Sequence, residues 1–168
     1  LNNIIRRVNG KTFHCVESFL PDAGYEAFVI TVGTPLREGE KHPNFEYIKS
    51  AVESLRNVYT GKELIILRST VSVGTTRDVV IPLLSMISGV DADDVLVAMC
   101  PERTVEGKAV YELSHLPQII GGNNEKSLEI AEKLFRQMTP FVIRVSSLEE
   151  AELVKLFCNT YRDLSFSI

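Results

Sequence analysis

Short runs of Val, Ile and Leu with almost no polar interruption recur along this 168-residue chain, and longer amphipathic segments separate them. Three of these runs occupy residues 27–32, 64–67 and 95–99. A strand that is apolar at nearly every position must be buried on both faces, as in a parallel sheet that helices cover on either side. The alternation of such strands with helices predicts an α/β fold, doubly wound around a mostly parallel sheet.

The other predicted elements continue this alternation. Helices are expected at residues 44–59, 75–87, 125–137 and from 147 to the end of the chain, and short strands at 11–16, 118–120 and 141–145. Thr75 is expected to cap the second helix, and Pro82 is expected to kink it. Residues 147–150 (Ser-Leu-Glu-Glu) match a capping box, which marks the start of the last helix.

Composition argues against several classes of protein. The chain is 45% hydrophobic and 24% charged, which is typical of a soluble globular domain. Its formal charge of −4 argues against a nucleic-acid-binding surface, and no apolar run is long enough to cross a bilayer. Cys15, Cys100 and Cys158 are widely spaced and the three histidines lie apart, so no metal site is expected. We therefore expect a cytoplasmic protein.

Polar residues follow three of the predicted strands: Thr34 and Pro35, then Ser69 and Thr70, then Glu102. In an open α/β sheet, ligands bind in the crevice beyond the carboxyl ends of the strands. These residues are therefore candidates for binding a polar ligand. Ser and Thr also cap strands and helices in proteins that bind nothing there, and the pattern by itself is compatible with both interpretations.

The segment that follows residues 95–99 contains two carboxylates four positions apart, Glu102 and Glu106, with Arg103 between them. Glutamates at the end of a sheet strand can handle protons or bind sugar hydroxyls, so this segment is a candidate active site. The alternative is a solvated turn with ordinary surface charges.

Three polar residues share one face of the predicted last helix, because Lys155, Asn159 and Arg162 lie at positions i, i+4 and i+7. The apolar residues between 153 and 164 are expected to bury most of this helix. A polar stripe in so apolar a helix is costly unless it lines a wet cleft, where an ammonium beside an amide can stabilise an oxyanion and place a water. The alternative is the exposed stripe of a surface helix.

Four motifs follow one another along the chain, at residues 32–36 (VGTPL), 69–76 (STVSVGTT), 101–107 (PERTVEG) and 152–160 (ELVKLFCNT). From about residue 29 onward, the chain resembles the UDP-glucose and GDP-mannose dehydrogenase family of nucleotide-sugar 6-dehydrogenases. Within this family, the Pro-Glu-Arg form and the runs at 116–122 and 159–163 look most like the branch that acts on UDP-N-acetylhexosamines.

The resemblance implies an incomplete Rossmann-type NAD domain over residues 1–146. It also implies that residues 147–168 begin a long interdomain helix, which helps to build a homodimer or larger assembly in the full-length protein. The glycine-rich fingerprint of the family is expected before Leu1, and its catalytic cysteine beyond Ile168. The chain alone is therefore expected to be inactive.

The activity implied by the resemblance is a two-step oxidation of a sugar C6 alcohol to a carboxylate, with two NAD molecules and a cysteine thioester. The favoured substrate is UDP-N-acetyl-D-mannosamine. UDP-glucose and UDP-N-acetylglucosamine are alternatives, as is a non-catalytic nucleotide-binding or assembly module. On the cofactor side, the resemblance assigns Thr34, Pro35, Ser69, Thr70 and Glu106 to NAD.

On the substrate side, the resemblance implies that Glu102 holds or activates water in the hydrolytic step. Lys155 would stabilise the oxyanion formed at C6, and Asn159 would orient substrate and water. The other substrate-binding assignments are Arg103, Glu106 and Arg162.

Overall fold

The computed structural model describes residues 12–21, 23–35, 44–105 and 107–167. Its elements, in chain order, are β1 (Ala27–Ile30), α2 (Glu46–Glu53), β2 (Leu64–Leu67), η1 (Thr76–Val80), α3 (Ile81–Ser88), β3 (Val97–Met99), α4 (Ala109–His115), β4 (Gln118–Gly122), α5 (Glu125–Phe135), β5 (Val142–Arg144) and α6 (Leu148–Phe166). Among these residues, no helix is both long and apolar enough to cross a membrane.

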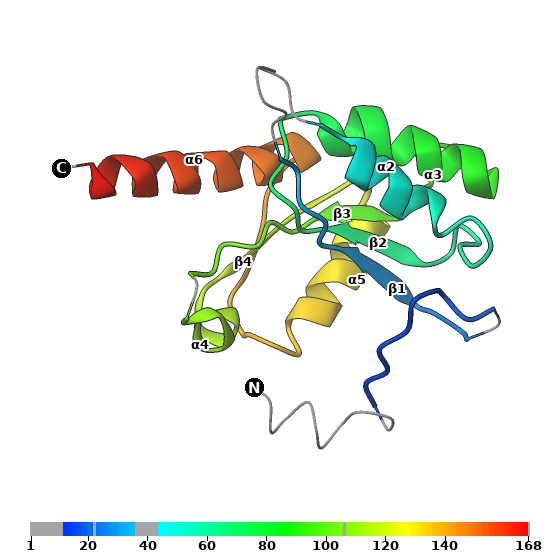
Figure 1. The fold of residues 1–168 in the computed structure, drawn as a ribbon, viewed down its shortest axis with the longest axis horizontal. Helices are drawn as coiled ribbons and strands as arrows, with labels where there is room; N and C mark the ends of the chain where they lie inside the picture. The colour runs from blue at the N-terminus through cyan, green and yellow to red at the C-terminus, as the bar shows by residue number, and fades with distance from the viewer. Residues whose placement is uncertain (1–11, 22, 36–43, 106, 168) are drawn as a thin grey trace.

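One sheet of five strands forms the centre of the fold, and its spatial order β1-β2-β3-β4-β5 follows the chain (Figure 1). β1, β2 and β3 are parallel to one another. β4 runs antiparallel to β3, and β5 is parallel to β4. The reversal is consistent with the connection after β3, because α4 buries no residue and so does not act as a crossover helix packed on the sheet. The predicted α/β fold with a mostly parallel sheet is confirmed.

Helices cover both faces of this sheet (Figure 1). α2, α3 and the first turns of α6 contribute to the core on one face, and α5 to the core on the other. Within β2, Ile65 and Leu67 belong to the first core, whereas Leu64 and Ile66 belong to the second. Successive side chains of a strand point to opposite faces, so the run must be apolar throughout. Burial of each of these side chains stabilises the fold by roughly 1.5–3 kcal/mol.

The start of α6 packs closely against β4. A Cβ atom at Gly121 would clash with the main-chain oxygen of Ser147, so this strand position has room only for glycine. Ser147 Oγ accepts a hydrogen bond from the N–H of Glu150 at 3.1 Å, as the predicted capping box requires. The Glu150 carboxylate accepts from the N–H of Ser146 at 2.7 Å, one residue earlier than in the standard box.

The second half of α6 extends away from the sheet (Figure 1). Phe157 is 65% exposed and Tyr161 is 75% exposed, and Leu164 is also exposed. The expectation that the apolar residues between 153 and 164 bury most of this helix is therefore wrong for this chain. The physical reason is geometric: α6 has its buried residues at its start, and from there it runs beyond the sheet on which it would pack.

Two other expectations need correction. Residues 12–16 form no strand, and only Phe13 makes an isolated bridge. An alternating pattern marks residues that could lie on a half-buried strand, but a strand also needs a continuous ladder of hydrogen bonds to a neighbour, and residues 12–16 make only this single bridge. Lys11 lies outside the described residues. α4, in turn, was not predicted, because its exposed sequence has no apolar stripe facing a core.

The helix after β2 begins differently from the expectation. Thr75 precedes it as predicted, but the Thr75 side chain makes no capping hydrogen bond and instead donates to the main-chain oxygen of Ser72 at 2.7 Å. The kink at Pro82 stays a prediction; the structure has a wider π-helical turn, η1, directly before α3, and Pro82 lies in the first turn of α3. Pro82 has no N–H to donate, and its ring would crowd the carbonyl of Asp78 in a regular α-helix.

Candidate active site

The loops that follow β1 and β2 are tied together by their hydroxyl groups. Thr34 Oγ1 donates a hydrogen bond to the main-chain oxygen of Thr70, and Ser69 Oγ donates to the main-chain oxygen of Val32 at 2.6 Å. The structure therefore brings together three of the residues that the sequence assigned to the cofactor. The hydroxyl protons of Thr34 and Ser69 hold the loops in place, whereas their hydroxyl oxygens keep lone pairs that can accept from a ligand.

Pro35 belongs to a hollow in the surface beside these loops. Its lining also includes Val32, Gly33, Thr34 and Tyr47, and its volume is about 740 Å³. A Cβ atom at Gly33 would meet no atom within 4 Å, so a ligand can approach the main chain there. Apolar rings next to hydroxyl groups and open main chain fit the flat bases and the riboses of a dinucleotide such as NAD.

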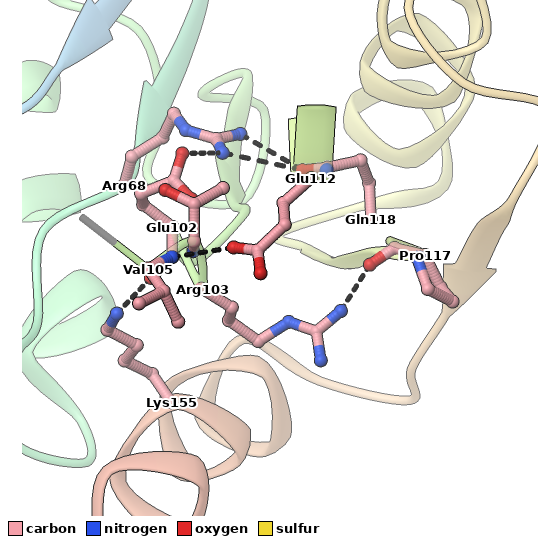
Figure 2. Close-up of polar contacts among 9 residues, drawn as sticks. Arg68, Glu102, Arg103, Val105, Glu112, Pro117, Gln118 and Lys155 are labelled. Atoms are coloured by element: carbon pink, nitrogen blue, oxygen red, sulfur yellow. Dashed lines mark hydrogen bonds and ion pairs between the residues drawn. The ribbon is translucent and has the colours of Figure 1, made fainter. Parts of the chain in front are cut away.

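Glu102 follows β3 and lies beside the end of β2, because its N–H donates to the main-chain oxygen of Arg68 at 3.2 Å. Its carboxylate accepts from Arg68 Nη2 at 2.7 Å and from the N–H of Thr104 at 2.7 Å (Figure 2). Burial alone would raise the pKa of Glu102. The hydrogen bonds from Arg68 and Thr104 outweigh this effect, so the pKa lies below its ordinary value. Glu102 is therefore an ionised acceptor at neutral pH.

Lys155 reaches this strand end from α6. Its ammonium donates a hydrogen bond to the main-chain oxygen of Glu102, across 53 residues of sequence (Figure 2). Two of the three residues predicted to be catalytic, Glu102 and Lys155, therefore lie in contact. Partial burial lowers the pKa of Lys155, and the Glu102 charge only partly opposes this shift. An ammonium has three N–H donors, so two remain to bind an oxygen of a ligand.

The other residues predicted to bind the substrate are not all directed toward Glu102 and Lys155. Asn159 and Arg162 follow Lys155 along one face of α6, partly exposed, and make no side-chain hydrogen bond within the described part of the chain. The Arg103 guanidinium points away from Lys155 and donates to the main-chain oxygen of Pro117 (Figure 2). Glu106 lies outside the described residues. The structure thus joins Glu102 to Lys155, while Arg103 is turned toward the start of β4.

Arg68 and Glu152 complete the site, and neither was identified from the sequence. Arg68 ends the apolar strand β2 and is only 9% exposed. Glu152 is fully buried and lies one turn before Lys155 on α6. Its carboxylate accepts from the N–H groups of Gly74 and Thr76, at 2.6 and 2.7 Å, and so caps the helix after β2. A charged residue next to an apolar run was the available signal for both, because Arg68 directly follows residues 64–67 and Glu152 directly precedes Leu153 and Val154.

Similarity to known proteins extends over most of the chain. Residues 7–139 match the family described as UDP-glucose/GDP-mannose dehydrogenase family, NAD binding domain. UDP-N-acetyl-D-mannosamine dehydrogenase of Methanocaldococcus jannaschii is 35% identical over 145 residues, which are 85% of this chain and 33% of that protein. UDP-N-acetyl-D-glucosamine 6-dehydrogenase of Pseudomonas aeruginosa is 30% identical over 143 residues, which are 84% of this chain and 34% of that protein.

The fold of this chain is also similar to that of a solved structure. The UDP-D-ManNAc dehydrogenase from Pyrococcus horikoshii superposes with a TM-score of 0.76 at 35% sequence identity, over 83% of this chain and 33% of that one. The chain therefore spans about a third of the length of these relatives. The match over residues 7–139 shows that the chain belongs to the UDP-glucose/GDP-mannose dehydrogenase family, and the part of the family that it matches is the NAD-binding domain.

Proposed function

We propose that this chain is part of an NAD-dependent nucleotide-sugar 6-dehydrogenase, which oxidises the C6 alcohol of a UDP-sugar to a carboxylate in two hydride transfers. The contact between the Lys155 ammonium and Glu102, at the open end of the parallel strands, is the observation that supports this proposal most directly. It brings the ammonium to the main-chain oxygen of the residue whose carboxylate lies at the same strand end, and an oxygen that becomes negatively charged there can be stabilised by the ammonium.

Each side chain of the site has a role in this proposal. Accepting the hydrides that leave C6 is the chemistry that NAD supplies when bound. Thr34 and Thr70 hold the cofactor side, and the two free N–H donors of Lys155 bind the oxygen on C6 as negative charge develops there. The ionised Glu102 accepts a hydrogen bond from water in the hydrolytic step, and Asn159 orients that water and the sugar.

The thiol that forms the thioester belongs, in this proposal, outside the 168 residues. Cys100 is fully buried, and burial raises its pKa to about 12, so it cannot supply a thiolate at neutral pH. We also propose that residues 1–146 lie in the NAD-binding domain. Residues 147–168 then form the start of an interdomain helix, which the exposed apolar residues of α6 would suit in a homodimer or larger assembly.

For the substrate we propose UDP-N-acetyl-D-mannosamine. The Pro-Glu-Arg sequence at residues 101–103 and the run at 116–122 favour the N-acetylhexosamine branch. The relative of that name from Methanocaldococcus jannaschii is more similar to this chain than the UDP-N-acetyl-D-glucosamine enzyme, at 35% against 30% identity.

NADH formation tests this proposal in a protein that contains the chain together with the rest of the family's length. UDP-N-acetyl-D-mannosamine, UDP-N-acetyl-D-glucosamine, UDP-glucose and GDP-mannose are compared as substrates. We expect the fastest turnover with the first, and about two NADH for each sugar oxidised. NADH formation with UDP-glucose alone would overturn the substrate assignment. NAD binding without oxidation of any sugar would favour a non-catalytic nucleotide-binding module.

Lys155→Ala separates the proposed chemistry from cofactor binding. Because Lys155 contacts the strand end from the substrate side, its loss is expected to reduce kcat by roughly 100-fold or more, as removal of an oxyanion donor does. The dissociation constant for NAD is expected to change little. Lys126→Ala, in the first turn of α5, is the matched control and should leave kcat unchanged. Equal losses in turnover and in NAD affinity would contradict this role for Lys155.

A further inference from the structure

Arg68 is a buried cation with three kinds of partner. Its guanidinium donates to the Glu102 carboxylate at 2.7 Å and to Gln118 Oε1 at 3.4 Å from both terminal nitrogens (Figure 2). It also lies over the ring of Phe135, at 5.0 Å from the centroid. A charge this deeply buried is tolerated only with such partners. Among them, Glu102 alone is negatively charged.

The Glu102 carboxylate is held at both of its oxygens. Oε2 accepts from Arg68 and Oε1 accepts from the N–H of Thr104 at 2.7 Å. Protonation of either oxygen would place a hydroxyl group against an N–H donor. A carboxylate has about four acceptor sites, so two remain open, and the side chain is 37% exposed. Glu102 is therefore arranged to accept further hydrogen bonds and not to donate one.

We propose that Arg68 is a positioning residue for the site: it fixes the Glu102 carboxylate in its ionised form, so that Glu102 receives hydrogen bonds from water or sugar and does not act as an acid. This inference rests on the proposed function. In this proposal, a residue directly after β2 controls the protonation of Glu102 in the loop after β3.

The other charged groups around Glu102 do not replace Arg68. Lys155 of α6 contacts the main-chain oxygen of Glu102, and Arg103 of the same loop contacts the main-chain oxygen of Pro117. Arg162 lies two turns beyond Lys155 on α6. On the α4 side, the Glu112 carboxylate is engaged by the N–H of Val105 at 2.6 Å. Within the described part of the chain, Arg68 is the cation in direct contact with the Glu102 carboxylate.

Gln118 supports this arrangement because it is neutral. Its Oε1 satisfies the guanidinium without adding a second negative charge, so Glu102 is the acidic partner among the groups hydrogen-bonded to Arg68. Gln118 is itself buried at the first position of β4. Through Glu102 and Gln118, Arg68 thus links the end of β2 to the loop after β3 and to the start of β4.

The first test is an NMR titration of the Glu102 side-chain carboxyl carbon in the full chain. Arg68→Met removes the charge and keeps an apolar side chain of similar length, and we expect the Glu102 midpoint to move to higher pH. Arg68→Lys keeps a charge and should restore most of the low midpoint. Arg56→Met, which removes the exposed arginine that pairs with Glu53 from the turn just after α2, is the control and should leave Glu102 unchanged.

An unchanged midpoint in Arg68→Met would overturn the inference. Circular dichroism shows whether each variant is folded, and Arg68→Gln takes the place of Arg68→Met if the apolar substitution prevents folding. The titration needs no substrate, so it decides the role of Arg68 even if no nucleotide sugar is oxidised.

The second test is the pH profile of kcat in the protein of full family length. In Arg68→Met, the acid limb of the profile is expected to move to higher pH, while KM for NAD stays within about twofold. Arg68→Lys is expected to move the limb back. Sugar oxidation with an unshifted limb in Arg68→Met would refute the role of Arg68 and leave the proposed function intact. Absence of oxidation in the wild type, with a shifted NMR midpoint, would refute the proposed function instead.

Discussion

Glu152→Ala is expected to loosen the attachment of α6 to the rest of the domain. The Glu152 carboxylate is fully buried and receives three hydrogen bonds: from the N–H of Gly74 at 2.6 Å, from the N–H of Thr76 at 2.7 Å and from Thr76 Oγ1 at 2.6 Å. Alanine removes both acceptor oxygens and with them all three hydrogen bonds. The two N–H groups then remain at the start of a helix without a partner.

The magnitude follows from what each group loses. A buried N–H without an acceptor costs about 1–3 kcal/mol, and two are created here. The Thr76 hydroxyl can rotate to another acceptor, so its loss is small. Removal of a buried carboxylate returns part of its desolvation cost, which offsets some of the loss. We expect the free energy of unfolding to fall by about 3 kcal/mol.

Chemical denaturation of the chain measures this change, with Glu149→Ala as the matched control. Glu149 is also in the first turn of α6, but its partner Arg77 is half-exposed, so its loss is expected to cost less than about 1 kcal/mol. Hydrogen exchange at Gly74 and Thr76 should accelerate in Glu152→Ala only. A loss of less than about 1 kcal/mol in Glu152→Ala, or equal losses in both variants, would refute the argument that the buried cap holds α6 in place.

Two further predictions concern packing and pH. Gly121→Ala places a Cβ against the main-chain oxygen of Ser147 and is expected to lower the free energy of unfolding by about 1–3 kcal/mol. The control Gly33→Ala has open space around the added Cβ and should change the free energy of unfolding by less than about 0.5 kcal/mol. Equal effects of the two substitutions would contradict the clash at Gly121. The hydrogen bond from Arg77 lowers the pKa of Glu149 to about 2, so this pair stabilises the fold above the ordinary pKa of glutamate and loses that contribution as the pH falls toward 2. The stability difference between wild type and Arg77→Met should therefore shrink over this acidic range, and a constant difference would refute the pairing.

The order of apolar and polar residues in the sequence was enough to predict those strands and helices whose burial follows from their own residues. β2 coincides with the run at 64–67, because four consecutive apolar residues suit a strand that is buried on both faces. α5 begins at the predicted residue and ends two residues before the predicted end, since its apolar stripe faces the core and its charged side faces solvent.

The same reasoning failed where a distant partner was needed. Residues 12–16 alternate like a strand but have no described neighbour to pair with, and the apolar residues in the second half of α6 extend beyond the sheet. Periodicity records which residues could be buried. It does not record whether another element lies there to bury them.

In the candidate site, too, some residues could be predicted from the sequence and others could not. Likeness to a family placed Glu102 and Lys155 in one site, although spacing alone could not join residues 53 positions apart. Arg68 and Glu152 escaped notice because a charge is buried only where folding brings it a partner. The partner of Arg68 depends on β2 lying beside the loop after β3, and that of Glu152 on α6 crossing the start of the helix after β2. Both partners are far apart in the sequence and become neighbours only in the folded chain, so a short stretch of sequence cannot predict either contact.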